Sequence, residues 1–497
     1  MAEKILEPSN FDLLKKLIEK PDTTFSEAIQ IAELGTTYKR TGFHFDKRLE
    51  KQGDAISYFK KNNELSFVTD QSAKTHKLIT GDNYPALLNL LVEYKGKIDV
   101  IYIDPPYGKD SMGEFAETNY ENAITRDNLL SMLYPRLYLA KQLLSDSGVI
   151  FCSIDDRNQA YIKCLFDEVF GESNFVANLI WKCKSGGAND SRFFAIDHEY
   201  VLVYARNTNN FVLQLDKEAE VSTSYNLEDE KGRKYALDRL DKQSLGWLES
   251  LDFPIIAPDG KIYKVEHKNP TNKIARWRWG KETVKERYNE LVFKDGYVYT
   301  KNYQKEGAIP RSLLITDRFG RTRTGKTDFS DLFGASIFNN PKPYKLIKYL
   351  IQIASNNNTI ILDFFAGSGT TGQAVLELNK EDNGNRQFIL VTNNEKTDTT
   401  PNGIAIDVTS KRLKRVMTGK CYDGASDFEW AKKNKPLGGN LLVMDIAEVS
   451  NFEAVKGKTP FDVIDETLYG KEKSKTIKEK VEWVCDNFEG TQKRLEE

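Results

Sequence analysis

The stretch Val100-Ile101-Tyr102-Ile103-Asp104-Pro105-Pro106-Tyr107 decides how the middle of this chain can fold. The four apolar residues predict a buried strand, and the two prolines end it because they lack the N–H groups that a strand ladder needs. In an open α/β sheet, ligands bind beyond the carboxyl ends of the strands. A carboxylate, exposed carbonyls and a flat ring at that place suit a planar base with an exocyclic amine, although a proline-stiffened turn explains these four residues equally well.

The segments on either side of this stretch alternate between strand and helix patterns, which predicts a doubly wound, parallel α/β sheet. Gly148 is expected to end the helix predicted at 126–145, as a C-terminal glycine commonly does. The predicted strands cover 77–80, 98–103, 149–154, 359–363 and 388–391, and the predicted helices cover 84–94, 126–145, 342–355 and 370–379.

A chain of 497 residues is too long for one ordinary core, so two to four domains are expected. Residues 207–330 have short, often interrupted apolar runs and predict an inserted domain of mixed β character. The remaining segments are a charged, helical N-terminal part (1–75), two halves of the sheet domain (76–206 and 331–420), and a tail (421–497) with a strand at 440–444 and a helix at 471–487.

The composition excludes several classes of protein. The net charge of -2 combines 71 basic with 73 acidic residues, which does not exclude a nucleic-acid partner because local patches matter more than sums. The five cysteines and four histidines lack the spacing of disulfide frameworks or metal sites, so no metal is expected. No apolar run approaches the roughly 18 residues of a membrane span, and no signal peptide is visible, so we expect a soluble, cytoplasmic protein.

A second motif, Phe364-Phe365-Ala366-Gly367-Ser368-Gly369-Thr370-Thr371, joins a predicted strand to a predicted helix. Glycines at such a turn let a ligand approach the backbone, and the helix N-terminus attracts a carboxylate or phosphate. Gly367, Gly369 and Gly372 also match the G-x-G-x-x-G pattern of dinucleotide sites. Glu395, after the next strand, is placed to hold ribose hydroxyls of either a dinucleotide or S-adenosylmethionine, so it does not discriminate.

Together, the glycine turn, Gly81-Asp82-Asn83 and the Asp104–Tyr107 motif resemble the amino-group DNA methyltransferases over most of residues 76–420. The catalytic motif precedes the cofactor motif by about 260 residues, which is similar to the permuted β class with its target-recognition domain between the halves. The run 338–343, Phe-Asn-Asn-Pro-Lys-Pro, resembles the family's additional cofactor-contacting motif. Trp181 and His198-Glu199-Tyr200 are similar to segments in the modification (Mod) subunits of type III restriction-modification systems.

The resemblance implies a circularly permuted, Rossmann-like class I methyltransferase fold and transfer of a methyl group from S-adenosyl-L-methionine to adenine N6. It also implies double-stranded DNA, a homodimer and a separate restriction subunit as partners. It makes Asp104, Pro105, Pro106 and Tyr107 catalytic. The implied cofactor-binding residues are Asp82, Asn83, Lys342, Asp363, Phe365, Ala366, Gly367, Ser368, Gly369, Thr370, Thr371 and Glu395.

The chemistry explains these assignments. Asp104 can accept one N6–H of adenine and a carbonyl of Pro105–Pro106 the other, which stabilises charge that develops in the transition state. Tyr107 would stack on the base, which must first be flipped out of the duplex at a cost of a few kcal/mol. Stacking returns roughly 1–3 kcal/mol per base.

The inserted region predicts a DNA-binding face, because cations neutralise phosphates and guanidinium groups can contact guanine. The alternative is that the tryptophans of this region belong to a core and its cations to a solvated surface. The expected contacts are Arg276, Trp277, Arg278, Trp279, Lys281, Arg321 and Arg323.

Residues 320–327 match the spelling of a Walker A loop, but 328–331 continue poorly as the apolar helix that such a loop opens. Three other functions stay open. One is a nicotinamide-dependent oxidoreductase that uses the glycine turn of 367–372. Another is a cytosine-N4 methyltransferase, although the leading Asp104 resembles adenine enzymes more closely. The third is a DNA-binding specificity module whose activity lies in a partner.

Overall fold

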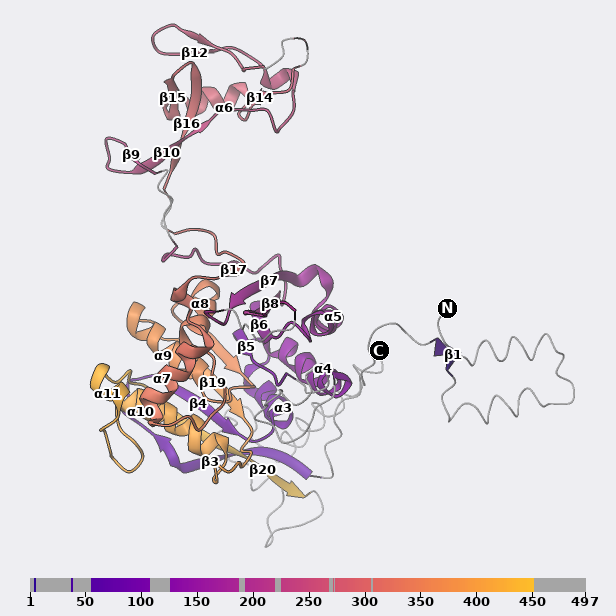
Figure 1. The fold of residues 1–497 in the computed structure, drawn as a ribbon, viewed down its shortest axis with the longest axis vertical. Helices are drawn as coiled ribbons and strands as arrows, with labels where there is room; N and C mark the ends of the chain where they lie inside the picture. The colour runs from indigo at the N-terminus through magenta and orange to yellow at the C-terminus, as the bar shows by residue number, and fades with distance from the viewer. Residues whose placement is uncertain are drawn as a thin grey trace, which may run out of the picture. The chain divides into compact units, whose positions relative to one another are not determined.

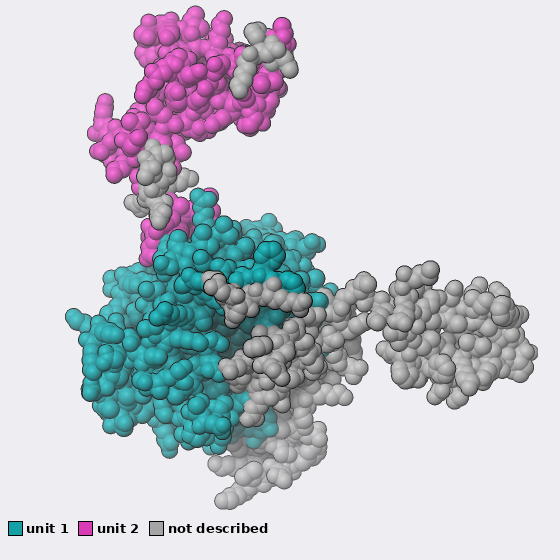
Figure 2. Space-filling view, in the orientation of Figure 1, with its two compact units in different colours: residues 1–212, 311–497 teal, residues 213–310 magenta. Residues whose placement is uncertain are grey.

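The computed structural model describes residues 4–5, 37–38, 55–107, 126–186, 193–219, 225–267, 271, 273–304 and 307–450. The chain forms two compact units (Figures 1 and 2). Unit 1 comprises residues 1–212 and 311–497, and unit 2 comprises residues 213–310. The sheet domain predicted from the sequence is part of unit 1, and unit 2 is inserted into it along the chain.

Unit 1 is built on a ten-stranded sheet with the order β17-β7-β8-β6-β5-β18-β19-β4-β20-β3. The six strands from β6 to β20 are mutually parallel, whereas β8 and β3 run antiparallel to their neighbours. The sheet is therefore mixed rather than purely parallel. The strands are β3 (Ala55–Phe67), β4 (Thr75–Thr80), β5 (Ile98–Ile103), β6 (Leu144–Ile154), β7 (Phe175–Lys182), β8 (His198–Ala205), β17 (Leu313–Leu314), β18 (Ile360–Asp363), β19 (Gln387–Thr392) and β20 (Asn440–Ser450).

Helices cover both faces of this sheet, which confirms the predicted α/β class (Figure 1). On one face, Leu133, Leu137 and Ile162 are fully buried against strand residues such as Ile103 and Ile150. Each such side chain contributes about 1.5–3 kcal/mol by leaving water. The helices of that face are α3 (Asn83–Tyr94), α4 (Arg126–Leu143) and α5 (Gln159–Phe170), and those of the other are α7 (Thr322–Phe333), α8 (Tyr344–Ala354), α9 (Thr370–Asp382) and α10 (Lys411–Thr418), with α11 (Glu429–Lys433) packed on α7.

Strands β5 and β18 are neighbours at the centre of the sheet although they lie far apart in the sequence. They pair in parallel, with Ile361 opposite Val100 and Leu362 opposite Ile101. Because parallel strands end at the same edge, this register brings Asp363, the last residue of β18, close to Asp104, which follows β5. The two motifs that were found separately in the sequence therefore meet at one edge of the sheet.

Two local predictions were wrong. Residues 55–67, assigned to a helical segment, form strand β3 and pair antiparallel with β20. Gly148 does not close helix α4, which ends at Leu143, but lies within strand β6. A Cβ atom at residue 148 would lie 3.0 Å from the carbonyl oxygen of Ile98, near the register shift between β5 and β6. The close approach of these two strands therefore explains the glycine.

Unit 2 has its own core and its own antiparallel sheet, in the order β15-β16-β10-β9. Leu240, Trp277 and Val298 are buried in that core. The sheet strands are β9 (Leu227–Glu228), β10 (Lys234–Arg239), β15 (Leu291–Lys294) and β16 (Tyr297–Tyr303), and the unit adds the short pairs β11 (Asp241–Lys242) with β14 (Arg276–Trp277) and β12 (Ile255–Ile256) with β13 (Ile262–Tyr263), and helix α6 (Lys281–Glu286).

Residues 311–330, which the sequence placed with the insert, belong to unit 1. Strand β17 pairs in parallel with β7, with Leu313 opposite Ile180, and helix α7 starts at Thr322. In the tail, β20 covers and extends the predicted strand at 440–444, and the helix predicted at 471–487 lies outside the described residues. Among the described helices, none has both the length and the apolar character needed to cross a bilayer.

Candidate active site

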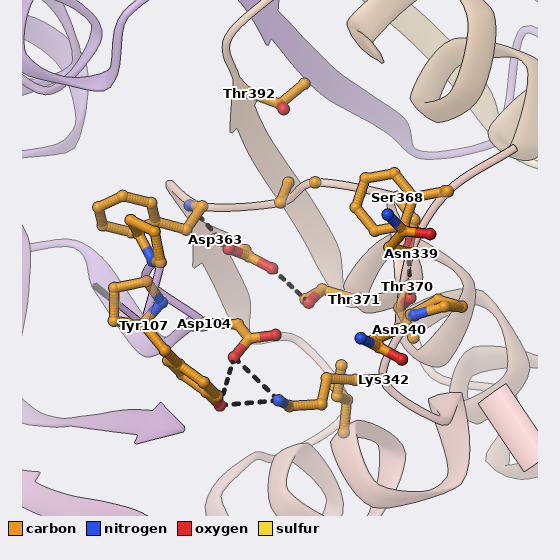
Figure 3. A pocket seen from close by; sticks show the side chains of 18 of the residues that line it. Asp104, Tyr107, Asn339, Asn340, Lys342, Asp363, Ser368, Thr370, Thr371 and Thr392 are labelled. Atoms are coloured by element: carbon orange, nitrogen blue, oxygen red, sulfur yellow. Dashed lines mark hydrogen bonds and ion pairs between the residues drawn. The ribbon is translucent and has the colours of Figure 1, made fainter. Parts of the chain in front are cut away.

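A cavity of about 600 Å³ lies at the carboxyl edge of the sheet in unit 1, where β5 and β18 end (Figure 3). Both sequence motifs line it, together with the segment that precedes helix α8. The predicted site residues among its lining are Asp104, Pro105, Pro106, Tyr107, Lys342, Asp363, Phe365, Ala366, Gly367, Ser368, Thr370 and Thr371. The two motifs therefore form one site.

Asp104 lies at the centre of a polar cluster in this cavity. Its Oδ1 accepts a hydrogen bond from the Tyr107 hydroxyl at 3.0 Å and lies 3.1 Å from the Lys342 ammonium. Burial raises the pKa of Asp104, and the nearby charge of Lys342 opposes that rise. The carboxylate is thus a half-buried acceptor whose charge is stabilised by the Lys342 ammonium.

Glu199, on strand β8, is the fourth member of this cluster and was not predicted as a site residue. Its Oε2 lies 2.8 Å from the Lys342 ammonium and 3.2 Å from the Tyr107 hydroxyl, and the ammonium also donates to that hydroxyl at 2.8 Å. Burial would lower the pKa of Lys342, but the two carboxylates outweigh burial and raise it. We refer to Asp104, Tyr107, Glu199 and Lys342 as the Asp104 cluster.

The glycine turn forms the other side of the cavity. Gly367 and Gly369 have φ angles of 46° and 77°, in the left-handed region that favours glycine. Asp363 fixes both ends of the turn, because it accepts hydrogen bonds from the Phe365 N–H at 3.0 Å and from the Thr371 hydroxyl at 2.5 Å. Burial raises the pKa of Asp363 to about 7.

Arg412, on helix α10, holds the turn from outside the cavity and was also missed in the sequence. Its guanidinium is fully buried and donates to the Thr370 hydroxyl at 2.7 Å, the Ser368 hydroxyl at 3.1 Å and the Gln373 side chain at 2.9 Å. Burial lowers the pKa of Arg412 to about 10. A buried cation under the start of helix α9 adds to the positive potential of that helix end.

The segment that carries Lys342 is fixed by helix α7. A Cβ atom on Gly325 would lie only 2.1 Å from the carbonyl oxygen of Pro341, so no larger residue fits between them. Residues 325–327 are part of helix α7 and not of a loop before it. The Walker-like spelling at 320–327 therefore reflects helix packing and not a phosphate loop.

Four predicted cofactor residues do not line the cavity: Asp82, Asn83, Gly369 and Glu395. Asp82 caps helix α3 by accepting from the Tyr84 N–H at 2.7 Å, and it forms an ion pair with Arg136 at 3.0 Å. Asn83 donates to the carbonyl of Phe364 at 2.9 Å, which ties helix α3 to the glycine turn. At the end of β19 the lining residues are Thr392 and Asn393.

The residues predicted to contact DNA are divided between the two units. Trp277 is 1% exposed and donates to the Phe253 carbonyl at 2.7 Å, so it is a core residue of unit 2. Arg321, in unit 1, is buried and donates to the carbonyls of Ile315 and Lys182. Neither side chain is displayed on the surface. DNA contact stays a prediction for the exposed or half-buried residues Arg276, Arg278, Trp279, Lys281 and Arg323.

Comparison with known proteins decides the family. The family model described as DNA methylase, which groups N6 and N4 enzymes, matches residues 98–414. The chain belongs to this DNA methylase family. Enzymes of the family use S-adenosyl-L-methionine as methyl donor, which confirms the predicted cofactor. Membership decides against the nicotinamide-dependent oxidoreductase. A second model, of an uncharacterised conserved protein, matches residues 1–100.

The chain is similar to three curated methyltransferases over most of its length. It is 33% identical to the EcoPI Mod subunit of Escherichia phage P1 over 68% of this chain and 62% of that protein. It is 34% identical to the StyLTI Mod subunit of Salmonella typhimurium over 65% of this chain and 53% of that protein. It is 29% identical to the type II methyltransferase M.KpnI of Klebsiella pneumoniae over 78% of this chain and 97% of that protein. The chain thus spans 53–62% of the length of these two type III relatives.

Among solved structures, a DNA modification methylase of Thermus thermophilus matches 74% of this chain and 99% of its own length, at 12% identity and a TM-score of 0.35.

Within the described residues, no group of three or more His, Cys, Asp or Glu side chains is arranged to bind a metal ion.

Proposed function

We propose that this chain transfers the methyl group of S-adenosylmethionine to the N6 amino group of an adenine flipped out of duplex DNA. The observation that carries the proposal is the shared cavity, in which the half-buried carboxylate of Asp104 faces the glycine turn of 367–369. A cavity of about 600 Å³ is in the usual range for small-molecule sites, roughly 300–1,000 Å³.

The glycine turn fits the methyl donor. A Cβ atom on Gly367 would lie 3.2 Å from the Phe338 ring, so the missing side chain keeps a narrow passage open beside that ring. The N–H groups at the start of helix α9 would bind the carboxylate of the donor, aided by the buried charge of Arg412. The bound donor supplies an electrophilic methyl group held on a sulfonium.

Asp104 and the prolines would act on the amine. The lone pair of an exocyclic amine is delocalised into the ring, and it becomes available when the nitrogen turns pyramidal. Asp104 would accept one N–H and a carbonyl of the Pro105–Pro106 segment the other, so both stabilise the charge that develops on nitrogen. The amine nitrogen would displace the sulfur of the donor directly, so that the C–S bond breaks, S-adenosylhomocysteine leaves and the amine gives up one proton to Asp104 or water; no enzyme nucleophile is required. Tyr107 supplies a ring for the base to stack on.

The choice of adenine over cytosine rests on the Asp-led motif and on similarity to Mod subunits. Cytosine N4 is the second candidate, because its amine has the same chemistry and the family model includes both kinds of enzyme. We further propose that the sheet is a circularly permuted methyltransferase fold. Its strand order places β4, β19, β18, β5 and β6 side by side, although β18 and β19 come last of these five in the chain.

The proposed partners follow from the type III relatives. They are duplex DNA, a second copy of the chain and a separate restriction subunit, in the cytoplasm. Unit 2 would be the target-recognition domain, because it is an insert with its own core between the two halves of the sheet domain.

A methyl-transfer assay tests the proposal. Purified protein is incubated with tritiated S-adenosylmethionine and duplex DNA, and the labelled nucleoside is identified by chromatography. We expect N6-methyladenine from the wild type and from Asp146→Asn, which changes an exposed carboxylate, and a loss of at least about 100-fold in Asp104→Asn. Label in N4-methylcytosine would refute adenine specificity, and full activity of Asp104→Asn would refute the role of Asp104.

A further inference from the structure

We propose that Glu199 is a positioning residue for methyl transfer: it holds the Lys342 ammonium so that Asp104 is free to accept the amine of the substrate base. This inference rests on the function proposed above. It concerns a residue on strand β8, which pairs antiparallel with β6 and belongs to neither of the two sequence motifs.

The Asp104 cluster contains two carboxylates and one ammonium (Figure 3 shows three of its members). The Lys342 side chain is 10% exposed, and its nitrogen lies 3.1 Å from Asp104, 2.8 Å from Glu199 and 2.8 Å from the Tyr107 hydroxyl. An ammonium has three N–H donors. These three partners therefore engage every donor of Lys342, and the shorter of its two carboxylate contacts is with Glu199.

This arrangement resolves a conflict at Asp104. Its Oδ1 receives both the Tyr107 hydroxyl and the Lys342 ammonium. The base can use Oδ2, but both donors draw on the charge of the carboxylate that the proposed reaction needs as an acceptor for an N–H of the base. Removing one partner from a buried ion pair is costly, because it leaves an uncompensated charge. With Glu199 present, Lys342 can release Asp104 and still keep a carboxylate partner. The free-energy cost of breaking the Lys342–Asp104 ion pair, which the base must offset, is therefore smaller than it would be without Glu199.

Glu199 also orients the ring on which the base would stack. The Tyr107 hydroxyl has one proton and lies within hydrogen-bonding distance of both carboxylates, at 3.0 Å from Asp104 and 3.2 Å from Glu199. When the base occupies Asp104, the hydroxyl can donate to Glu199 without moving the ring. Without the Glu199 carboxylate, both Lys342 and Tyr107 would have Asp104 as their single anionic partner in the cluster.

The test is a double-mutant cycle on steady-state methyl transfer, using a DNA duplex that carries the site methylated by the wild type. Glu199→Gln keeps an oxygen acceptor of the same shape and removes the charge. We expect kcat to fall at least tenfold and the affinity for S-adenosylmethionine, measured by calorimetry, to change less than twofold. Glu199→Asp should recover part of kcat, and Glu172→Gln, at an exposed glutamate, should leave kcat unchanged.

The second arm of the cycle removes the residue through which Glu199 acts. In a Lys342→Met background, Glu199→Gln should change kcat less than twofold, because there is no ammonium left to hold and the side-chain oxygen of glutamine can still accept from the Tyr107 hydroxyl. Equal effects in both backgrounds, or unchanged kcat in the single variant, would overturn the inference. A fluorescent 2-aminopurine at the target position reports flipping separately, and we expect its signal at saturating protein to fall in Glu199→Gln.

Failure of this inference is distinguishable from failure of the proposed function. If Asp104→Asn is inactive while Glu199→Gln keeps its full kcat, the proposed function stands and the role of Glu199 is refuted. If the wild type transfers no label from S-adenosylmethionine to DNA, the proposed function itself fails. Thermal denaturation of each variant, compared with the wild type, separates a loss of folding from a loss of chemistry.

Discussion

We expect His76, on strand β4, to make the stability of unit 1 depend on pH. The side chain is 1% exposed, and its ring stacks on Phe388 of the neighbouring strand β19 with centroids 4.1 Å apart. Its Nδ1 accepts a hydrogen bond from the backbone N–H of Phe388 at 3.2 Å, so the ring is neutral in the folded protein. Burial lowers the pKa of His76 to about 3, and the charge of Lys74 adds to the effect.

The sign and size of the effect follow from linkage. Below pH 6.5, the ordinary value for histidine, the unfolded chain binds a proton at His76, whereas the folded protein does not until about pH 3. The free energy of unfolding therefore falls as pH drops through this window. The loss is RT ln(1 + 10^(6.5 − pH)), which is about 0.06 kcal/mol at pH 7.5 and about 1.4 kcal/mol at pH 5.5.

Hydrogen exchange measures this loss directly. Amides at the centre of β4 and β19, including that of Phe388, should exchange only through unfolding of unit 1, so their protection gives its free energy. His76→Asn is the comparison, because its side-chain oxygen can replace Nδ1 as the acceptor but does not titrate. Between pH 7.5 and 5.5 the wild type should lose about 1.4 kcal/mol more than the variant. An equal loss in both proteins would refute the reasoning.

Three further predictions concern the site and the insert. Gly325→Ala should displace the segment around Pro341 and weaken S-adenosylmethionine binding about tenfold or more, since overpacking costs about 1–3 kcal/mol; unchanged affinity in calorimetry would contradict this. Arg157 lines the cavity and pairs with Asp155, and its Nη1 has no hydrogen-bond partner among the described residues; if that nitrogen contacts a DNA phosphate, Arg157→Gln should reduce the slope of log affinity against log salt by about 1, and an unaltered slope would exclude the contact. Trp277→Ala should destabilise unit 2 by about 3–5 kcal/mol in denaturant titrations, far more than Trp279→Ala at a half-buried site; similar losses would argue against the core role of Trp277.

The central part of the site could be predicted from sequence because strand ends follow simple rules. An apolar run that ends in Asp104-Pro105 and a glycine turn after Asp363 each identify the end of a parallel strand, and such ends share one edge of a sheet. The pairing of β5 with β18 then places both motifs in one cavity. The α/β class was predictable for the same reason.

Other parts depend on tertiary contacts that have no local signal. Glu199 reaches the site because β8 inserts antiparallel beside β6, and no periodicity or spacing in its own segment marks the carboxylate as a partner of Lys342. Arg412 supports the glycine turn from a helix more than 40 residues downstream. Trp277 alternates with arginines as a DNA-binding residue would, yet the core of unit 2 covers it. In each case the partner across space decides the role.

The central pairing of β5 with β18 also sets the order in which the protein can form during synthesis. Val100 and Ile361 are paired although 261 residues separate them along the chain. At about 5–20 residues per second, the ribosome needs roughly 13–52 s to make that stretch. During this time β5 has β6 on one side and an open edge on the other, and open strand edges invite pairing with other chains. A nascent chain therefore carries the carboxylate of Asp104 well before the glycine turn of 367–369 exists, and chains that stop before β18 are expected to aggregate.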